Sequence, residues 1–151
     1  MHSAWEQAGI WASVHADTRR ARRFAAFGPG SLLCFPWAAL YGEESIRIGS
    51  DTLIGPYCSL STGMVPGQPK LHDHILTIGD RCVIGRSNHL VAHFGVVLGD
   101  DVFTGPNGYV TDQNHAWSDR KAPIGRQSSP EQPVVIGRGR GSAPALWYFL
   151  V

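Results

Sequence analysis

Histidines are the residues of this sequence whose type and placement most directly suggest chemistry. Five of the seven lie between positions 72 and 115, namely His72, His74, His89, His93 and His115. An imidazole with an ordinary pKa of about 6.5 can remove a proton at neutral pH and so act as a general base. Neutral imidazole also binds metal ions, and the pairs His72 with His74 and His89 with His93 are candidates for that role. Which role applies depends on the elements that position the rings.

A six-residue repeat occupies the centre of the chain and predicts those elements. An aliphatic or similar residue followed by a small one recurs at Ile48, Ile54 and Leu60, at Ile78, Ile84 and Leu90, and at Leu98, Thr104 and Val110. A step of six fits neither an amphipathic helix nor a simple alternating strand. It predicts a parallel β-helix of triangular section, in which each hexad forms one short strand and one corner. Three hexads close a coil, and the aliphatic residues stack inward on their equivalents.

The residues four positions after the aliphatic ones are also expected to point inward. They are Thr52, Cys58, Cys82 and Val102, all small or medium in size, so the two cysteines are interpreted as core residues. Together with Cys34 they make an odd number without CxxC pairing, which argues against a disulfide framework or a zinc finger. Reduced thiols indicate a cytoplasmic protein.

Composition changes along the chain predict its organisation. Before the repeat, Trp5, Ile10, Trp11 and Val14 have the spacing of one apolar helix face. Two stretches rich in proline and polar residues interrupt the repeat and are expected to be loops. The predicted parts are a helical segment at 1–26, a β-helix domain at 27–137 with loops near 62–76 and 112–134, and an atypical tail at 138–151.

The charge balance excludes some partners. The formal net charge of +1 offers no bulk electrostatic reason to expect nucleic acid. A basic run at Arg19, Arg20, Arg22 and Arg23 is interpreted as a solvated face rather than a lipid or nucleic-acid site. No apolar run approaches the roughly 20 residues of a membrane span, and the N-terminal sequence has no targeting signal, so no membrane partner is expected.

Four stretches of the repeat carry a resemblance to a known family. They are "IRIGSDTLIGPYCSLS", "LTIGDRCVIGRSNHL", "VLGDDVFTGPNGYVTDQNHAWSD" and "APIGRQ…QPVVIG". They resemble the hexapeptide-repeat acyltransferases, which include sugar and maltose or galactoside O-acetyltransferases. The resemblance implies a left-handed parallel β-helix and a homotrimer with acetyl-CoA between neighbouring subunits. It also implies a small-molecule acceptor, such as a sugar, and no metal.

The same resemblance suggests the site residues. The histidine that removes the acceptor proton in the family matches His115, and Asp112 or Asn114 is near enough in sequence to orient its ring. Asn88 matches a position that contacts the acceptor, although asparagine is also common in turns. Trp117 is expected to line the acceptor pocket, because sugar faces stack on aromatic rings, or else to pack as an ordinary core residue. The residues that hold the coenzyme are not assigned.

The repeat departs from the family near its end. After Ile136 and Gly137, the next inward positions would be Ser142 and Tyr148, which do not fit the pattern. The chain therefore resembles a C-terminally truncated member. Two explanations stay open, a shifted reading frame beyond residue 137 or an apolar tail, "ALWYFLV", that caps the end of the coils.

Two alternative functions accompany the acyltransferase interpretation. One is a catalytically inactive, truncated β-helix or a structural trimer. The other is a zinc enzyme similar to the γ-type carbonic anhydrases, in which three histidines from two subunits bind the metal. Here the set would be His89, His93 and His115.

Overall fold

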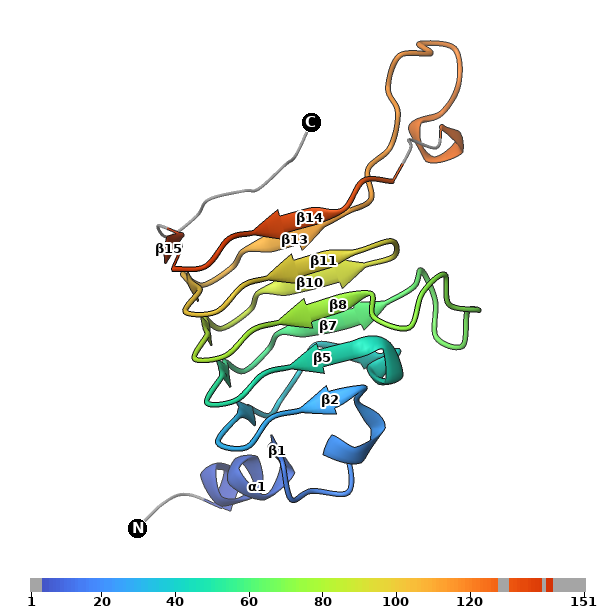
Figure 1. Ribbon diagram of the computed structural model, residues 1–151. Helices are drawn as coiled ribbons and strands as arrows, with labels where there is room; N and C mark the ends of the chain where they lie inside the picture. The colour runs from blue at the N-terminus through green and yellow to red at the C-terminus, as the bar shows by residue number, and fades with distance from the viewer. Residues whose placement is uncertain (1–3, 128–130, 140, 143–151) are drawn as a thin grey trace.

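The fold consists of short strands wound into stacked coils, with one helix at the N-terminal end (Figure 1). The structure is a computed structural model, and it describes residues 4–127, 131–139 and 141–142. Its strands form three sheets, and apart from β1 each described strand of a sheet comes from a different coil, which is a β-helix-like arrangement. Sheet A contains β1 (Val14–His15), β3 (Leu32–Leu33), β6 (Leu53–Ile54), β9 (Val83–Ile84), β12 (Phe103–Thr104) and β15 (Gly141–Ser142). Sheet B contains β2 (Ala26–Phe27), β5 (Ile46–Ile48), β8 (Leu76–Ile78), β11 (Val96–Leu98) and β14 (Val134–Ile136). Sheet C contains β4 (Ala39–Tyr41), β7 (Ser59–Thr62), β10 (His89–Ala92) and β13 (Tyr109–Thr111).

Equivalent residues of the six-residue repeat lie directly above one another. In sheet B, Ile48 pairs with Ile78, which pairs with Leu98, which pairs with Ile136, all in parallel strands. The other two sheets keep the same order of coils through their parallel pairs. The register expected from the hexads is therefore the register of the structure.

The core is a column of inward side chains that runs through the coils. The aliphatic residues of the hexads are buried, as are the four residues predicted to join them. Thr52, Cys58, Cys82 and Val102 are each exposed by 2% or less. No single coil could bury such a column, so the core exists only because the coils stack.

A further coil precedes the first predicted hexad. Its strands β2, β3 and β4 pair in parallel with β5, β6 and β7 of the next coil. Phe27 and Leu33 are separated by the usual six residues, but Leu40 comes after seven, so the pattern is imperfect there. The coil falls within the β-helix domain predicted from residue 27, although the regular hexads were recognised only from Ile48.

The N-terminal helix is shorter than expected and its apolar face is different. Helix α1 (Ala4–Ala12) ends before Val14, and Ile10 and Trp11 on it are exposed by 62% and 85%. The Ser13 hydroxyl donates to the Gly9 carbonyl at 2.8 Å and accepts the Phe35 N–H at 3.0 Å, so the helix ends against the first coil. Val14 is buried in β1, which pairs antiparallel with β3. The prediction of one apolar helix face that includes Ile10, Trp11 and Val14 was wrong.

No helix in the ranges that the structure describes is long and apolar enough to cross a membrane.

Part of the basic run binds a buried carboxylate. Arg20 and Arg23 lie 3.0 and 3.5 Å from the carboxylate oxygens of Glu43, which is 1% exposed. The Arg20 guanidinium also lies 4.9 Å from the centre of the Trp37 ring. A buried carboxylate is costly unless it is paired. These two arginines therefore hold the N-terminal segment to the first coil instead of forming only a solvated face.

The corners of the coils are joined by polar side chains. The Ser50 N–H donates to Asp80 at 2.7 Å, and the Asp80 N–H donates to Asp100 at 3.0 Å in the next coil. Arg81 hydrogen-bonds Asp101 at 2.7 Å and thereby lowers the pKa of that exposed carboxyl. Two columns of corner residues have a positive φ between 54° and 62°. One column contains Asp51, Arg81 and Asp101, and the other contains Tyr57, Ser87 and Asn107.

Coil spacing predicts the effect of one glycine substitution. A Cβ at Gly79 would lie 2.6 Å from the Gly99 carbonyl carbon and from a carboxylate oxygen of Asp100. We expect Gly79→Ala to lower the free energy of unfolding by about 1–3 kcal/mol, as overpacking does, in denaturant titrations. Gly137 occupies the same step of the repeat but has no described atom within 4 Å of that position, so Gly137→Ala is the matched control. Equal losses in the two variants would contradict the spacing argument.

Burial also predicts the reactivity of the cysteines. All three are free, and burial raises the pKa of the thiols of Cys34, Cys58 and Cys82. A raised thiol pKa means less thiolate at neutral pH, and the thiolate is the reactive form. We expect iodoacetamide to label Cys58 and Cys82 slowly in the folded protein and rapidly in denaturant, as read by mass spectrometry. Labelling of either residue in the folded protein at the rate of a model peptide would show that the core opens readily.

Candidate functional site

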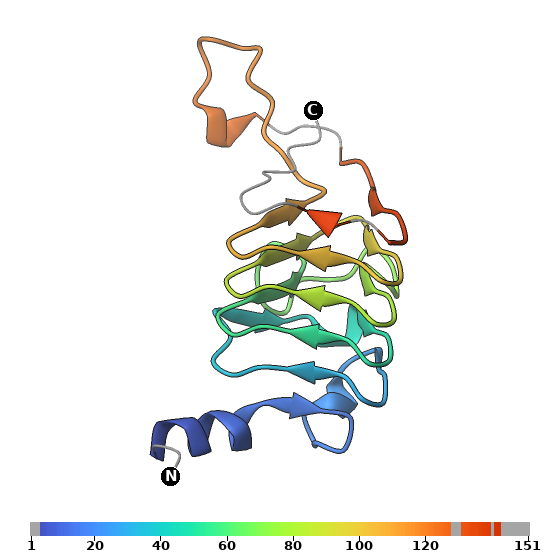
Figure 2. The ribbon, with the colours of Figure 1, turned by 90° about the vertical axis from the view of Figure 1, so that its left-hand side faces the viewer.

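Three connections lie above one another along the edge where sheet C passes to sheet B. We call them the first loop (63–75, between β7 and β8), the short turn (93–95, between β10 and β11) and the long loop (112–133, between β13 and β14). The first loop and the long loop extend on the same side of the coils, and the long loop lies at the end opposite α1 (Figures 1 and 2). The stacking of the coils places the short turn between the two larger connections.

His115 lies near the start of the long loop with its ring exposed to solvent. Its Nδ1 is 3.3 Å from the Gln127 carbonyl oxygen. A carbonyl only accepts hydrogen bonds, so in the neutral ring this contact requires the proton on Nδ1, and the lone pair is then on Nε2. Sequence reasoning proposed Asp112 or Asn114 as the group that orients this ring. Instead, the contact comes from the Gln127 backbone, while the Asn114 side chain accepts the His115 N–H at 2.8 Å.

Gln127 also closes the outer part of the long loop. Its side-chain amide donates to the carbonyls of Asp119 and Ala122 at 2.8 and 2.9 Å and accepts the Asp119 N–H at 3.1 Å. Gln127 thus holds the outer part of the loop together through its side chain and contacts the His115 ring through its backbone carbonyl. The sequence held no signal for it, because Gln127 follows His115 by 12 positions in a stretch without periodicity.

Asp112 is buried at the base of the long loop and serves the short turn. Its carboxylate accepts the N–H groups of His93 at 3.0 Å, Phe94 at 2.8 Å and Gly95 at 2.5 Å. At 6% exposure it has little surface left for a substrate. The carboxylate therefore fixes the backbone of the short turn relative to the long loop.

Asn88 lies inside a corner of the coils, away from solvent. It is 1% exposed, donates to the carbonyls of Gly85 and Gly105 at 2.7 and 2.8 Å, and accepts the Gly108 N–H at 3.1 Å. Its amide thus joins two successive coils, the turn-like role that sequence reasoning kept as the alternative. Trp117, in contrast, is on the long loop with His115 and is 77% exposed.

A polar cluster that sequence reasoning missed joins all three connections. His93, on the short turn, contacts Glu131 of the long loop through Nδ1, and its Nε2 is 3.0 Å from the side-chain nitrogen of Gln68 on the first loop. The side-chain oxygen of Gln68, Oε1, accepts the Met64 N–H at 2.7 Å. Gln113 reaches Glu131 at 3.5 Å and the Met64 sulfur at 2.8 Å. Glu131 follows His93 by 38 positions, so no local motif marks the pair.

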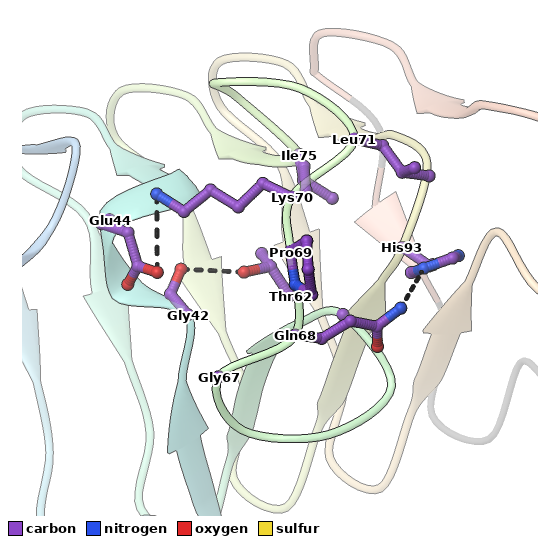
Figure 3. A pocket seen from close by; sticks show the side chains of 11 residues that line it. Gly42, Glu44, Thr62, Gly67, Gln68, Pro69, Lys70, Leu71, Ile75 and His93 are labelled. Carbon is purple, nitrogen blue, oxygen red and sulfur yellow. Dashed lines mark hydrogen bonds and ion pairs between the residues drawn. The ribbon is translucent and has the colours of Figure 1, made fainter.

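A pocket adjoins this cluster on the side of the first loop (Figure 3). His93 and Gln68 line one end of it, and an ion pair between Lys70 and Glu44 at 3.4 Å lies at the other. Thr62 donates to the Gly42 carbonyl at 2.8 Å on its floor. The pocket thus has both polar and apolar side chains, and it spans the first loop, the short turn and the 42–45 connection between β4 and β5.

The histidines that sequence reasoning considered for zinc have separate partners. His89 Nδ1 lies 2.7 Å from the Ser59 hydroxyl, while His93 and His115 make the contacts given above. Among the residues that the structure describes, no three histidine, cysteine, aspartate or glutamate side chains gather into a metal-binding group.

Comparison with known proteins gives one coarse indication of function. The chain is 32% identical over 68 residues to the "Probable acetyltransferase Rv3034c" of Mycobacterium tuberculosis, and the match covers 45% of this chain and 23% of that protein. No protein-family profile and no solved structure matches the chain. The similarity supports a transferase of the acetyltransferase kind. The chain matches less than a quarter of the length of that protein.

The buried hydrogen bonds of the Asn88 side chain predict that its removal destabilises the fold. We expect Asn88→Ala to lower the free energy of unfolding by about 1–3 kcal/mol, since buried backbone groups lose their partners. Denaturant titration measures this, with the exposed Asn114→Ala as the control of the same residue type. Wild-type stability of Asn88→Ala would contradict its role in the corner.

Proposed function

We propose that this chain is a CoA-dependent acyltransferase with the left-handed β-helix of the hexapeptide-repeat acyltransferases. It moves an acetyl or other acyl group from acetyl-CoA to a hydroxyl or amine of a sugar or another small metabolite. The observation that carries the proposal is the state of the His115 ring. Its Nδ1 is held by the Gln127 carbonyl, and its Nε2 is available on a loop in contact with solvent. The similarity to a probable acetyltransferase agrees with this reaction class.

The chemistry needs one base and two substrates held close together. His115 Nε2 takes the proton of the acceptor hydroxyl or amine as its oxygen or nitrogen attacks the thioester carbonyl carbon. The tetrahedral oxyanion then collapses, the carbon–sulfur bond breaks, and the proton on His115 passes to the leaving sulfur. Holding both substrates on the protein removes much of the entropic barrier. No covalent intermediate on the protein is required.

The other candidate residues take different parts in this proposal. Trp117, exposed on the same loop as the base, offers a ring face on which a sugar can stack. Asn114 lies beside the base and fixes its backbone. Asn88 and Asp112 have their polar atoms engaged with backbone groups, so we assign them to the support of the site.

The proposal includes a cytoplasmic homotrimer with acetyl-CoA between subunits. The outer face of sheet A supports an interface between copies, because Leu53, Val83 and Phe103 lie in register there. They are 42%, 37% and 55% exposed, a contiguous apolar column of the kind that marks interaction sites. The three free cysteines suit a reducing compartment.

A pair of histidine variants tests the assignment of the base. We expect His115→Ala to bind acetyl-CoA as the wild type does, while turnover falls by about 10²–10⁴-fold, the usual contribution of a general base. Calorimetry with acetyl-CoA measures binding, and release of the CoA thiol in the presence of a panel of sugars and amino sugars measures turnover. His74→Ala, an exposed histidine on the first loop, is the control. Unchanged turnover in His115→Ala would refute the assignment.

The same preparation separates the alternative functions. A folded trimer that binds no acetyl-CoA would favour a structural, non-catalytic β-helix. Zinc found by elemental analysis in the purified trimer would favour the carbonic anhydrase-like alternative, since ligands for that metal would come from two subunits.

A further inference from the structure

We propose that His93 is the positioning residue of the candidate site. In this role it ties both ends of the long loop to the coils and so holds His115 against Gln127. The inference rests on the proposed function for its activity readout, whereas its structural readout is independent of any reaction. It concerns a histidine that takes no part in the proton transfer itself.

Hydrogen-bond geometry determines which ring nitrogen of His93 carries the proton. The side-chain oxygen of Gln68, Oε1, accepts the Met64 N–H at 2.7 Å. The other end of the same amide, Nε2, is therefore the atom that faces His93. That nitrogen only donates, and His93 Nε2 at 3.0 Å must therefore accept. The proton of the neutral ring is then on Nδ1, which donates to the carboxylate of Glu131.

Both ring nitrogens of His93 are thus already engaged. The side chain is only 15% exposed, and that of Glu131 is 22% exposed. A base for an incoming substrate needs a free lone pair directed at solvent, which His115 has and His93 lacks. The arrangement suits a residue that holds other groups in place.

The contacts of His93 connect the two ends of the long loop. Glu131 lies near the end of that loop, and Gln113, near its start, contacts the same carboxylate oxygen at 3.5 Å. Asp112 binds the backbone N–H of His93 itself at 3.0 Å. The side chain and the backbone of one residue therefore hold both ends of the loop next to each other.

The position of the base depends on that closure. His115 follows Gln113 by two residues, and Gln127 precedes Glu131 by four. The contact between His115 Nδ1 and the Gln127 carbonyl joins the two sides of the loop just beyond the tie. If the ends separate, this contact is lost, and the ring is no longer restricted to the tautomer with a free Nε2. A misplacement of about 1 Å is enough to reduce a rate by about 100-fold.

Two substitutions of Glu131 test the proposal. Both contacts of Glu131 Oε1 are those of an acceptor, so Glu131→Gln keeps an oxygen for His93 and Gln113, and Glu131→Ala removes it. Asp17→Ala, which removes an exposed carboxylate at the opposite end of the coils, is the control. The chain of 151 residues is used throughout.

The first readout is the ¹⁵N chemical shifts of the His115 ring, which report its tautomer by NMR. We expect the wild type, Glu131→Gln and Asp17→Ala to show a protonated Nδ1, and Glu131→Ala to show an averaged pair of tautomers. The second readout is turnover with acetyl-CoA and a responsive acceptor. Here we expect kcat of Glu131→Ala to fall by roughly 10- to 100-fold while KM for acetyl-CoA stays unchanged.

The outcomes of the two readouts are separable. His115 shifts that are the same in Glu131→Ala as in Asp17→Ala overturn the positioning role, and so do equal changes in Glu131→Gln and Glu131→Ala. If the wild type transfers no acyl group, the proposed function fails, but the NMR comparison still decides whether His93 and Glu131 set the state of His115.

Discussion

Each coil of this chain buries its inward side chains only against the coils before and after it, at the short spacing that backbone hydrogen bonds between parallel strands impose. That spacing leaves no room for a side chain where one corner passes over the next, as at Gly79. It also brings polar atoms of successive corners within hydrogen-bond distance, which is why Asp80 and Asn88 bind backbone groups of neighbouring coils. Core, corner glycines and polar corner contacts are therefore three results of one constraint.

The same constraint explains how the candidate site is assembled. Since the register of the strands is kept from coil to coil, every connection between sheet C and sheet B leaves the coils at the same edge. A connection there can be long or short without disturbing the core. The short turn lies between two longer loops, so one side chain on it, His93, reaches a residue on each. The rigid coils supply the fixed position, and the loops supply the exposed histidine and tryptophan.

The sequence predicted the repeating part of the fold because six-residue spacing is a direct record of which residues stack. The inward positions of Thr52 and Cys82 were predicted in this way. In the first coil the spacing is irregular, so no hexads were recognised there, although the predicted β-helix domain begins at residue 27. The predicted helix face was wrong, because the helix ends at Ala12 and Ile10 and Trp11 on it are exposed. Roles at the site were harder to predict. Asp112 and Asn88 bind backbone atoms that no motif reveals, and His93 and Glu131 meet only after the coils have stacked.

The parallel pairing of strands from coil to coil also has a mechanical consequence. Hydrogen bonds between coils run along the axis of the stack, whereas the strands run across it. A force that pulls the two ends of the chain apart along this axis acts on the hydrogen bonds between one pair of neighbouring coils at a time. Extension then proceeds by peeling coils from an end at low force, and the coils that carry the first loop and the long loop lengthen the chain by larger steps than the coil that carries the short turn. A load applied across the axis is instead shared by the covalent backbone of all the coils.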